Sequence, residues 1–197
     1  MKVYAMNVST INPDDTKWYR NLSQKRIEKV KRYKQDKNKK QSIGAELLLR
    51  YALMKMTGET GAVDWDTEEN GKLYLVNHPD IYVNLSHSGD YAVCAVNDSP
   101  IGVDIQRCNE CDIDIAKRFF TEEETEYIIN SKDVNTAFYE VWTKKESFVK
   151  ATGTGITVPL GSFSVLDDTI TYEGQVYKFS RCRLSQDGYQ LFVCSRV

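Results

Sequence analysis

Three short segments of the sequence concentrate side chains that can bind phosphate groups or a metal ion. They are residues 84–89 (NLSHSG), residues 102–107 (GVDIQR) and residues 142–150 (WTKKESFVK). The first offers hydroxyls and an imidazole, the second a carboxylate close to an amide, and the third a carboxylate among amines. A carboxylate pair with a nearby lysine suits metal-assisted phosphoryl chemistry.

The second segment alternates in the manner of a β-strand. Period two places Val103 and Ile105 on one face, with Asp104 and Gln106 on the other. If the apolar pair faces a core, the carboxylate and the amide lie side by side and can hold a hard cation through oxygen. An exposed strand face with ordinary polar residues explains the same alternation, and the segment alone favours that simpler interpretation.

The third segment has the spacing of a helix. Trp142, Glu146 and Lys150 fall on one stripe, because residues three and four positions apart are neighbours on a helix. Taken alone, Glu146 and Lys150 are more typical of a routine surface ion pair. His87 is one of two histidines in the chain, and an isolated histidine is more often structural than catalytic.

Charge is distributed unevenly along the chain. Residues 24–40 contain nine basic and two acidic side chains, so this segment carries +7 and leaves −9 on the remainder of a chain whose net charge is −2. A basic segment on an acidic body suggests a polyanionic partner such as a group of phosphates. A solvated helix face explains a lysine-rich stretch equally simply.

Composition excludes several classes of protein. The chain has 197 residues, of which 41% are hydrophobic, and no apolar run reaches the roughly 20 residues that span a bilayer. The N-terminus lacks the features of a secretion signal, so we expect a cytoplasmic location. The five cysteines are then expected to be free thiols. Cys108 and Cys111 have a zinc-like spacing, but no second Cys or His pair follows.

The elements that must position these segments alternate between helical and extended patterns. We expect an α+β fold of two similar, closely packed lobes, residues 1–100 and 101–197, in each of which helices pack on an antiparallel sheet. Helical patterns cover residues 14–57, with Gly44 as a possible division and Gly58 as the end, and residues 113–152, with a capping box from Thr121 to Glu124. Extended patterns cover residues 3–8, 63–66, 72–76, 82–86, 91–96, 101–106 and 162–197.

Taken together, the three segments resemble the phosphopantetheinyl transferases of the long, single-chain class typified by the surfactin synthetase activator. That family has a serine-histidine-serine segment, then a Gly-x-Asp strand, then a Trp-x-x-Lys-Glu helix with a lysine four residues beyond the glutamate. The stretches GAELLLR (44–50) and IAKRFFTEEE (115–124) also fit, so the resemblance covers nearly the whole chain.

The resemblance implies an enzyme that binds coenzyme A between the two lobes, with Mg²⁺ on its pyrophosphate. A serine of an apo acyl- or peptidyl-carrier protein attacks the phosphate attached to pantetheine, and adenosine 3′,5′-bisphosphate leaves. By the same resemblance, Asp104, Gln106 and Glu146 are the metal ligands. Glu146 is also the group proposed to deprotonate the serine, and Lys150 stabilises or protonates the departing phosphate.

The resemblance also assigns contacts with the coenzyme. Ser86 and His87 correspond to residues at its phosphates, and Lys72 to a lysine that touches it. Lys25 and Lys40 are expected to bind the 3′-phosphate and adenine end of the coenzyme. One departure stands out: the family often has glutamate where this chain has Gln106, so we expect weaker Mg²⁺ binding rather than loss of activity.

Two other functions compete with this interpretation. A nucleic-acid-binding module explains the basic segment, but it leaves Asp104, Glu146 and His87 without roles. A metal-dependent phosphohydrolase normally recruits more carboxylates and histidines for two metals. We therefore expect a monomeric transferase that engages neither nucleic acid nor a membrane, with residues 108–126 near the carrier-docking surface.

Overall fold

The computed structural model describes the backbone of residues 1–197 and every side chain except that of residue 156. Its α-helices are α1 (Gln24–Arg32), α2 (Asp36–Thr57), α3 (Ile113–Phe119), α4 (Glu122–Ile129) and α5 (Val134–Thr152). Its strands are β1 (Lys2–Asn7), β2 (Trp65–Thr67), β3 (Leu73–Leu75), β4 (Tyr82–Ser88), β5 (Tyr91–Asn97), β6 (Ile101–Arg107), β7 (Thr169–Tyr172), β8 (Gln175–Arg181) and β9 (Tyr189–Arg196).

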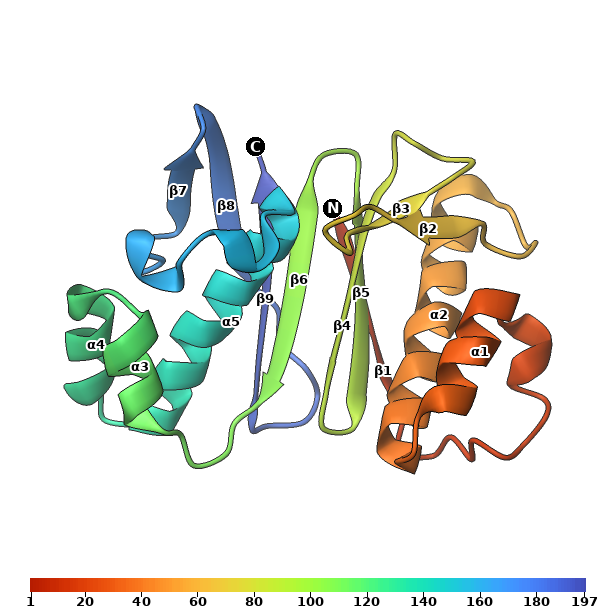
Figure 1. Ribbon diagram of the computed structural model, residues 1–197, viewed down its shortest axis with the longest axis horizontal. Coiled ribbons are helices and arrows are strands. Elements are labelled where there is room, and N and C mark those ends of the chain that lie inside the picture. The colour runs from red at the N-terminus through yellow and green to blue at the C-terminus, as the bar shows by residue number, and fades with distance from the viewer.

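The strands form three antiparallel sheets. One sheet has the order β1-β5-β4, another the order β6-β9-β8-β7, and β2 pairs with β3 in a small two-stranded sheet. Figure 1 shows β4, β5 and β6 in the centre of the molecule, with α1 and α2 on one side and α3, α4 and α5 on the other. The expected α+β fold of two helix-on-sheet halves is confirmed.

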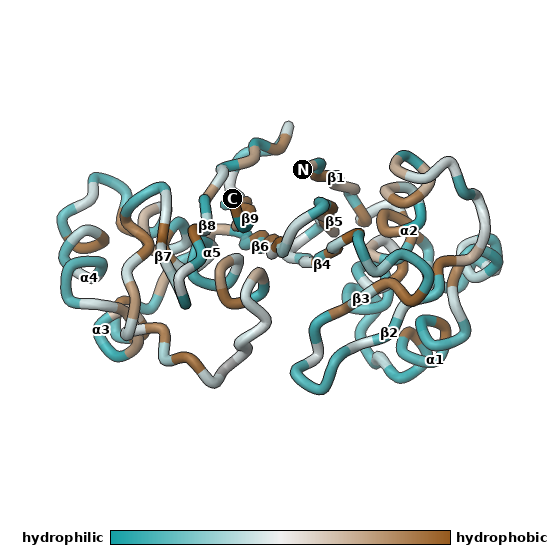
Figure 2. The backbone as a smooth tube through the Cα atoms, turned by 90° about the horizontal axis from the view of Figure 1, so that it is seen from above, coloured by the Kyte–Doolittle hydropathy of each residue, from teal (hydrophilic) through white to brown (hydrophobic). Residues whose placement is uncertain are grey.

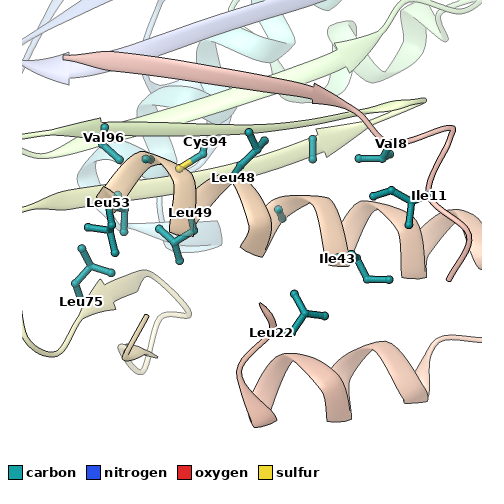
Figure 3. Packing of buried hydrophobic residues seen from close by; sticks show 14 of the residues in the cluster. Val8, Ile11, Leu22, Ile43, Leu48, Leu49, Leu53, Leu75, Cys94 and Val96 are labelled. Carbon is teal, nitrogen blue, oxygen red and sulfur yellow. The ribbon is translucent and has the colours of Figure 1, made fainter. Parts of the chain in front are cut away.

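The N-terminal half is built around α2, which packs against β1, β4 and β5. Figure 3 shows this helix between Cys94 and Val96 of β5 on one side and Leu22 and Leu75 on the other. Gly44 does not divide the helix. A Cβ at this position would collide with the side chain of Val8, so the glycine permits close packing of an unbroken helix.

The C-terminal half is built around α5, which crosses β6 and β9. Phe148 is fully buried there, with its ring centroid 4.8 Å from that of Phe163. A separate apolar cluster includes Val93 of β5 and Val103 and Ile105 of β6. It joins the two halves, and Figure 2 shows hydrophobic segments gathered along the central strands.

Local signals in the sequence located most element boundaries. Thr121 and Glu124 form the expected capping box, and Gly58 ends α2 in the left-handed conformation at φ 80°. The five cysteines are free. Among the described residues, every helix is too short or too polar to cross a lipid bilayer.

Candidate active site

Asp104 of β6 is the centre of a buried polar cluster. Its carboxylate is 2% exposed, and its Oδ1 accepts hydrogen bonds from Lys150 Nζ at 2.6 Å and from Ser86 Oγ at 2.8 Å. Its Oδ2 accepts from Gln106 Nε2 at 3.0 Å. Three segments far apart in the sequence therefore meet on one carboxylate.

The close approach of α5 to β6 depends on Gly102. A Cβ at this position would collide with the backbone of Ser147 and Ala151. Because the glycine lets the helix lie directly on the strand, Lys150 reaches Asp104 and also donates to Val103 O at 3.3 Å. The glycine of the Gly-x-Asp pattern thus sets the distance between the strand and the helix.

Glu146 faces the same cluster from α5. A cavity of about 340 Å³ is lined by Ser86, His87, Asp104, Gln106, Glu146 and Lys150, together with Leu85 and Trp142. Burial raises the pKa of the Glu146 carboxyl, the negative charge of Asp104 raises it further, and Lys150 partly opposes both. The routine Glu146–Lys150 ion pair does not form, because Lys150 pairs with Asp104 instead.

A second, more basic cavity of about 310 Å³ adjoins the first. Its lining includes Arg26, Lys29, Lys72, His87 and Lys150, and the last two of these residues line both cavities. Although His87 remains solvent-exposed, the surrounding protein desolvates its imidazole and lowers its pKa, and the charge of Lys150 lowers it further.

Lys72 closes the basic cavity beside the end of α5. Its Nζ donates to Ala151 O at 2.6 Å, and burial lowers its pKa. The residue lies just after the turn at Gly71, in which Asn70 Oδ1 accepts from Lys72 N at 2.8 Å. The turn therefore aims the lysine from the N-terminal half toward the C-terminal half.

Lys25 and Lys40 line neither cavity, although Lys25 contacts Trp65, which lines the basic one. Lys25 Nζ forms an exposed ion pair with Asp66 at 2.8 Å, and Lys40 Nζ donates to Ser9 O at 2.9 Å. Instead, Arg26 and Lys29 line the basic cavity. For Lys25 the helical phase of α1 explains the difference, because the inward face of this helix is fixed by the buried Arg26 and Val30. Lys40 lies on α2.

Arg26 is held in place by a buried carboxylate that the sequence analysis did not single out. Arg26 Nε lies 3.0 Å from Glu46 Oε2, and these side chains are only 6% and 1% exposed. Glu46 also accepts from Ser23 Oγ at 3.1 Å and from Trp65 Nε1 at 3.2 Å. Glu46 on α2 therefore fixes α1 and β2, and with them one wall of the basic cavity.

The donor set at Asp104 suits a hard cation. Two carboxylates and the amide oxygen of Gln106 are oxygen ligands, and Mg²⁺ is commonly held by one or two carboxylates, with water and substrate phosphate completing its shell. Among the described residues, no three His, Cys, Asp or Glu side chains come together in an arrangement that could hold a metal ion. The residues fit Mg²⁺ brought in with a phosphate ligand.

Comparison with known proteins gives matches along nearly the whole chain. A family model described as the 4′-phosphopantetheinyl transferase superfamily matches residues 100–194. A model described as 4′-phosphopantetheinyl transferase, N-terminal, matches residues 10–99. The boundary between these two matches falls between β5 and β6.

Individual relatives agree with the family models. A 4′-phosphopantetheinyl transferase of Bacillus subtilis is 36% identical over 88% of this chain and 82% of its own length. The 4′-phosphopantetheinyl transferase Sfp of Bacillus subtilis strain 168 is 30% identical over 99% of this chain and 92% of its own. With this coverage and identity, the protein belongs to the 4′-phosphopantetheinyl transferase family.

Proposed function

We propose that this chain transfers 4′-phosphopantetheine from coenzyme A to a serine of an apo acyl- or peptidyl-carrier protein, with Mg²⁺, and releases adenosine 3′,5′-bisphosphate. The observation that carries the proposal is the convergence of Asp104, Glu146 and Lys150 in a cavity that adjoins a basic one. We further propose that residues 1–100 and 101–197 act as two lobes of a cytoplasmic monomer with the active site between them.

The basic cavity is suited to the nucleotide end of coenzyme A. Arg26, Lys29, Lys72 and His87 line it, and these side chains can bind phosphate oxygens through charge-assisted hydrogen bonds. Arg26 is already oriented by Glu46, which reduces the entropy lost when it grips a ligand. In this proposal Arg26 and Lys29 take the role that the family resemblance implies for Lys25 and Lys40.

The reaction needs a base, a charge-neutralising centre and a proton donor. Glu146, whose pKa is raised by burial and by Asp104, accepts the proton of the carrier serine. The serine oxygen then bonds to the pantetheine phosphorus as the bond from that phosphorus to the bridging pyrophosphate oxygen breaks. Mg²⁺, when bound by Asp104, Glu146 and Gln106, neutralises charge on the pyrophosphate. Lys150 hydrogen-bonds to the departing phosphate.

Lys150 must leave Asp104 to perform this last role. In the structure its Nζ lies 2.6 Å from Asp104 Oδ1. Lys150 therefore already pairs with an oxygen atom that would bind the metal ion. A cation held by Asp104 would repel the ammonium group, and the substrate phosphate would offer that group another partner. Lys150 would then be free to hydrogen-bond to the reacting phosphate.

Intact mass spectrometry of the carrier tests this proposal. We would incubate the protein with coenzyme A, Mg²⁺ and either an apo acyl carrier protein or an apo peptidyl-carrier domain. A gain of one phosphopantetheine, abolished by EDTA and by Asp104→Asn, is the expected result. If neither carrier gains mass and the protein also fails to bind coenzyme A, the proposal is overturned. Salt-sensitive binding of nucleic acid would then support the competing interpretation.

A further inference from the structure

The two large sheets meet along β4 and β6 without any main-chain pairing between these strands. Side chains of β4 accept hydrogen bonds from the backbone of β6 instead. Asn84 Oδ1 accepts from Val103 N at 2.9 Å, Ser86 Oγ accepts from Ile105 N at 3.4 Å, and Ser88 Oγ accepts from Arg107 N at 2.9 Å. We call this set of three hydrogen bonds the side-chain ladder.

The side-chain ladder provides hydrogen-bond acceptors for the unpaired edge of β6. On one side β6 pairs with β9, and on the other side its N–H groups have no strand partner. At Val103 and Ile105 this edge of β6 is fully buried, and a buried N–H without an acceptor costs about 1–3 kcal/mol. At Arg107 the edge reaches the surface. Polar residues at alternate positions of β4 supply the acceptors, since alternate residues share one face of a strand.

The middle bond of the ladder is also part of the candidate active site. Ser86 Oγ accepts from Ile105 N, donates to Asp104 Oδ1 at 2.8 Å, and accepts from Lys150 Nζ at 3.2 Å. A shift of β4 along or away from β6 would therefore move Ser86 relative to the carboxylate and the ammonium group. The two outer bonds, at Asn84 and Ser88, oppose such a shift.

We propose that Asn84 and Ser88 are positioning residues that hold the N-terminal half in the alignment required at Asp104 and Lys150. This inference rests on the proposed function, because it assigns these residues a role in that reaction. Asn84 also lines the basic cavity, where it is within reach of a bound ligand. Ser88 lines neither cavity. A substitution at Ser88 therefore tests the alignment of the two halves without removing a contact with the ligand.

The test compares Ser88→Val with Ser88→Thr. The two replacements have nearly the same shape, and only threonine keeps the hydroxyl that accepts from Arg107 N. Small misplacements of reacting groups are costly in rate, so we expect Ser88→Val to lower kcat by about fivefold to tenfold. Its KM for coenzyme A should stay within about twofold of the unaltered protein, while Ser88→Thr should keep both constants.

Amide hydrogen exchange provides a second measurement that does not depend on activity. Ser88→Val should speed exchange at Arg107 N–H, and Ser88→Thr should not, with Ile101 N–H as an internal reference. If both variants keep the kcat of the unaltered protein, or if both lose kcat to the same extent, the positioning role is overturned. If the unaltered protein transfers nothing, the proposed function fails. Unchanged exchange at Arg107 would separately overturn the ladder.

Discussion

Each half of the protein contains one deeply buried ion pair, and the two pairs serve different purposes. In the N-terminal half, Arg26 and Glu46 are 6% and 1% exposed, and Arg26 also lines the basic cavity. In the C-terminal half, Lys145 and Glu124 are both fully buried at a distance of 2.8 Å, and neither lines a cavity described above. One pair presents a cation to the basic cavity, whereas the other lies wholly within the core.

Backbone groups complete the hydrogen bonding of the C-terminal pair. Lys145 Nζ donates to Leu160 O and Phe163 O, both at 2.7 Å. Glu124 Oε1 accepts from Val165 N at 2.9 Å. The pair therefore ties α4 and α5 to the loop that follows α5. A charged residue next to Glu146 in the sequence thus points into the core, while Glu146 itself faces the cavity.

The largest expected effect comes from breaking the C-terminal pair. Lys145→Met leaves Glu124 buried without its partner, so we expect a loss of about 3–5 kcal/mol in the free energy of unfolding. Urea titration of the purified variant measures this loss. The double variant Lys145→Met with Glu124→Gln removes both charges and should recover part of the loss. A single variant as stable as the unaltered protein would contradict the structural role.

The N-terminal pair predicts a loss of ligand binding. Arg26→Lys keeps a positive charge beside Glu46 but removes the planar fork that binds phosphate at two points. We expect the Kd for coenzyme A to rise about tenfold, measured by titration calorimetry.

The neighbouring residue provides a matched control. Lys25→Met should change the Kd by no more than about twofold, because Lys25 is exposed and paired with Asp66. A larger effect at Lys25 than at Arg26 would show that the coenzyme binds on the other face of α1.

Glu146, unlike Glu46 and Glu124, has no ion-pair partner among the described residues. Its titration gives a third prediction. Burial raises its pKa above the ordinary value of 4.5, so the folded state binds this proton more tightly than the unfolded state. The resulting stability is present below pH 4.5 and is lost as the pH rises through the raised pKa. Glu146→Gln should therefore raise Tm at pH 7 by roughly 1–3 °C and leave Tm at pH 4 unchanged, by calorimetry.

A further prediction concerns Gln106 and the affinity for Mg²⁺. Its Nε2 already donates to Asp104, and an amide oxygen brings no charge to a metal. Gln106→Glu should lower the Mg²⁺ concentration for half-maximal rate about threefold to tenfold. Gln106→Met, which is similar in length, should raise that concentration. If neither replacement changes the Mg²⁺ dependence, Gln106 is not a direct ligand.

Sequence reasoning succeeded where the determining interactions are local. The capping box at Thr121 and the end of α2 at Gly58 follow from residues within one helical turn. The three segments with chemical groups meet at Asp104, and the family resemblance had already assigned them to one site. Gly44 was misinterpreted as a possible break, since only the packed structure reveals that Val8 occupies the space of its missing side chain.

The remaining features depend on contacts between distant segments. The choice between Lys25 and Arg26 requires the rotational phase of α1, which Glu46 fixes from 20 positions further along the chain. The alternating Asn84, Ser86 and Ser88 were visible in the sequence, but their acceptor role requires knowing that β6 lies beside β4. The burial of Lys145 likewise cannot be read from its neighbours in the sequence, Lys144 and Glu146. It follows from the packing of the loop around residue 160, whose carbonyl groups accept hydrogen bonds from Lys145.

The main proposal is that the two adjoining cavities bind coenzyme A and that Glu146 acts as the base. The most direct test measures coenzyme A binding and single-turnover transfer by the same Glu146→Gln preparation, with Mg²⁺ and an apo peptidyl-carrier domain. We predict that the variant binds coenzyme A within about threefold of the unaltered protein and transfers phosphopantetheine at least about 100-fold more slowly. Transfer at the unaltered rate would contradict the claim.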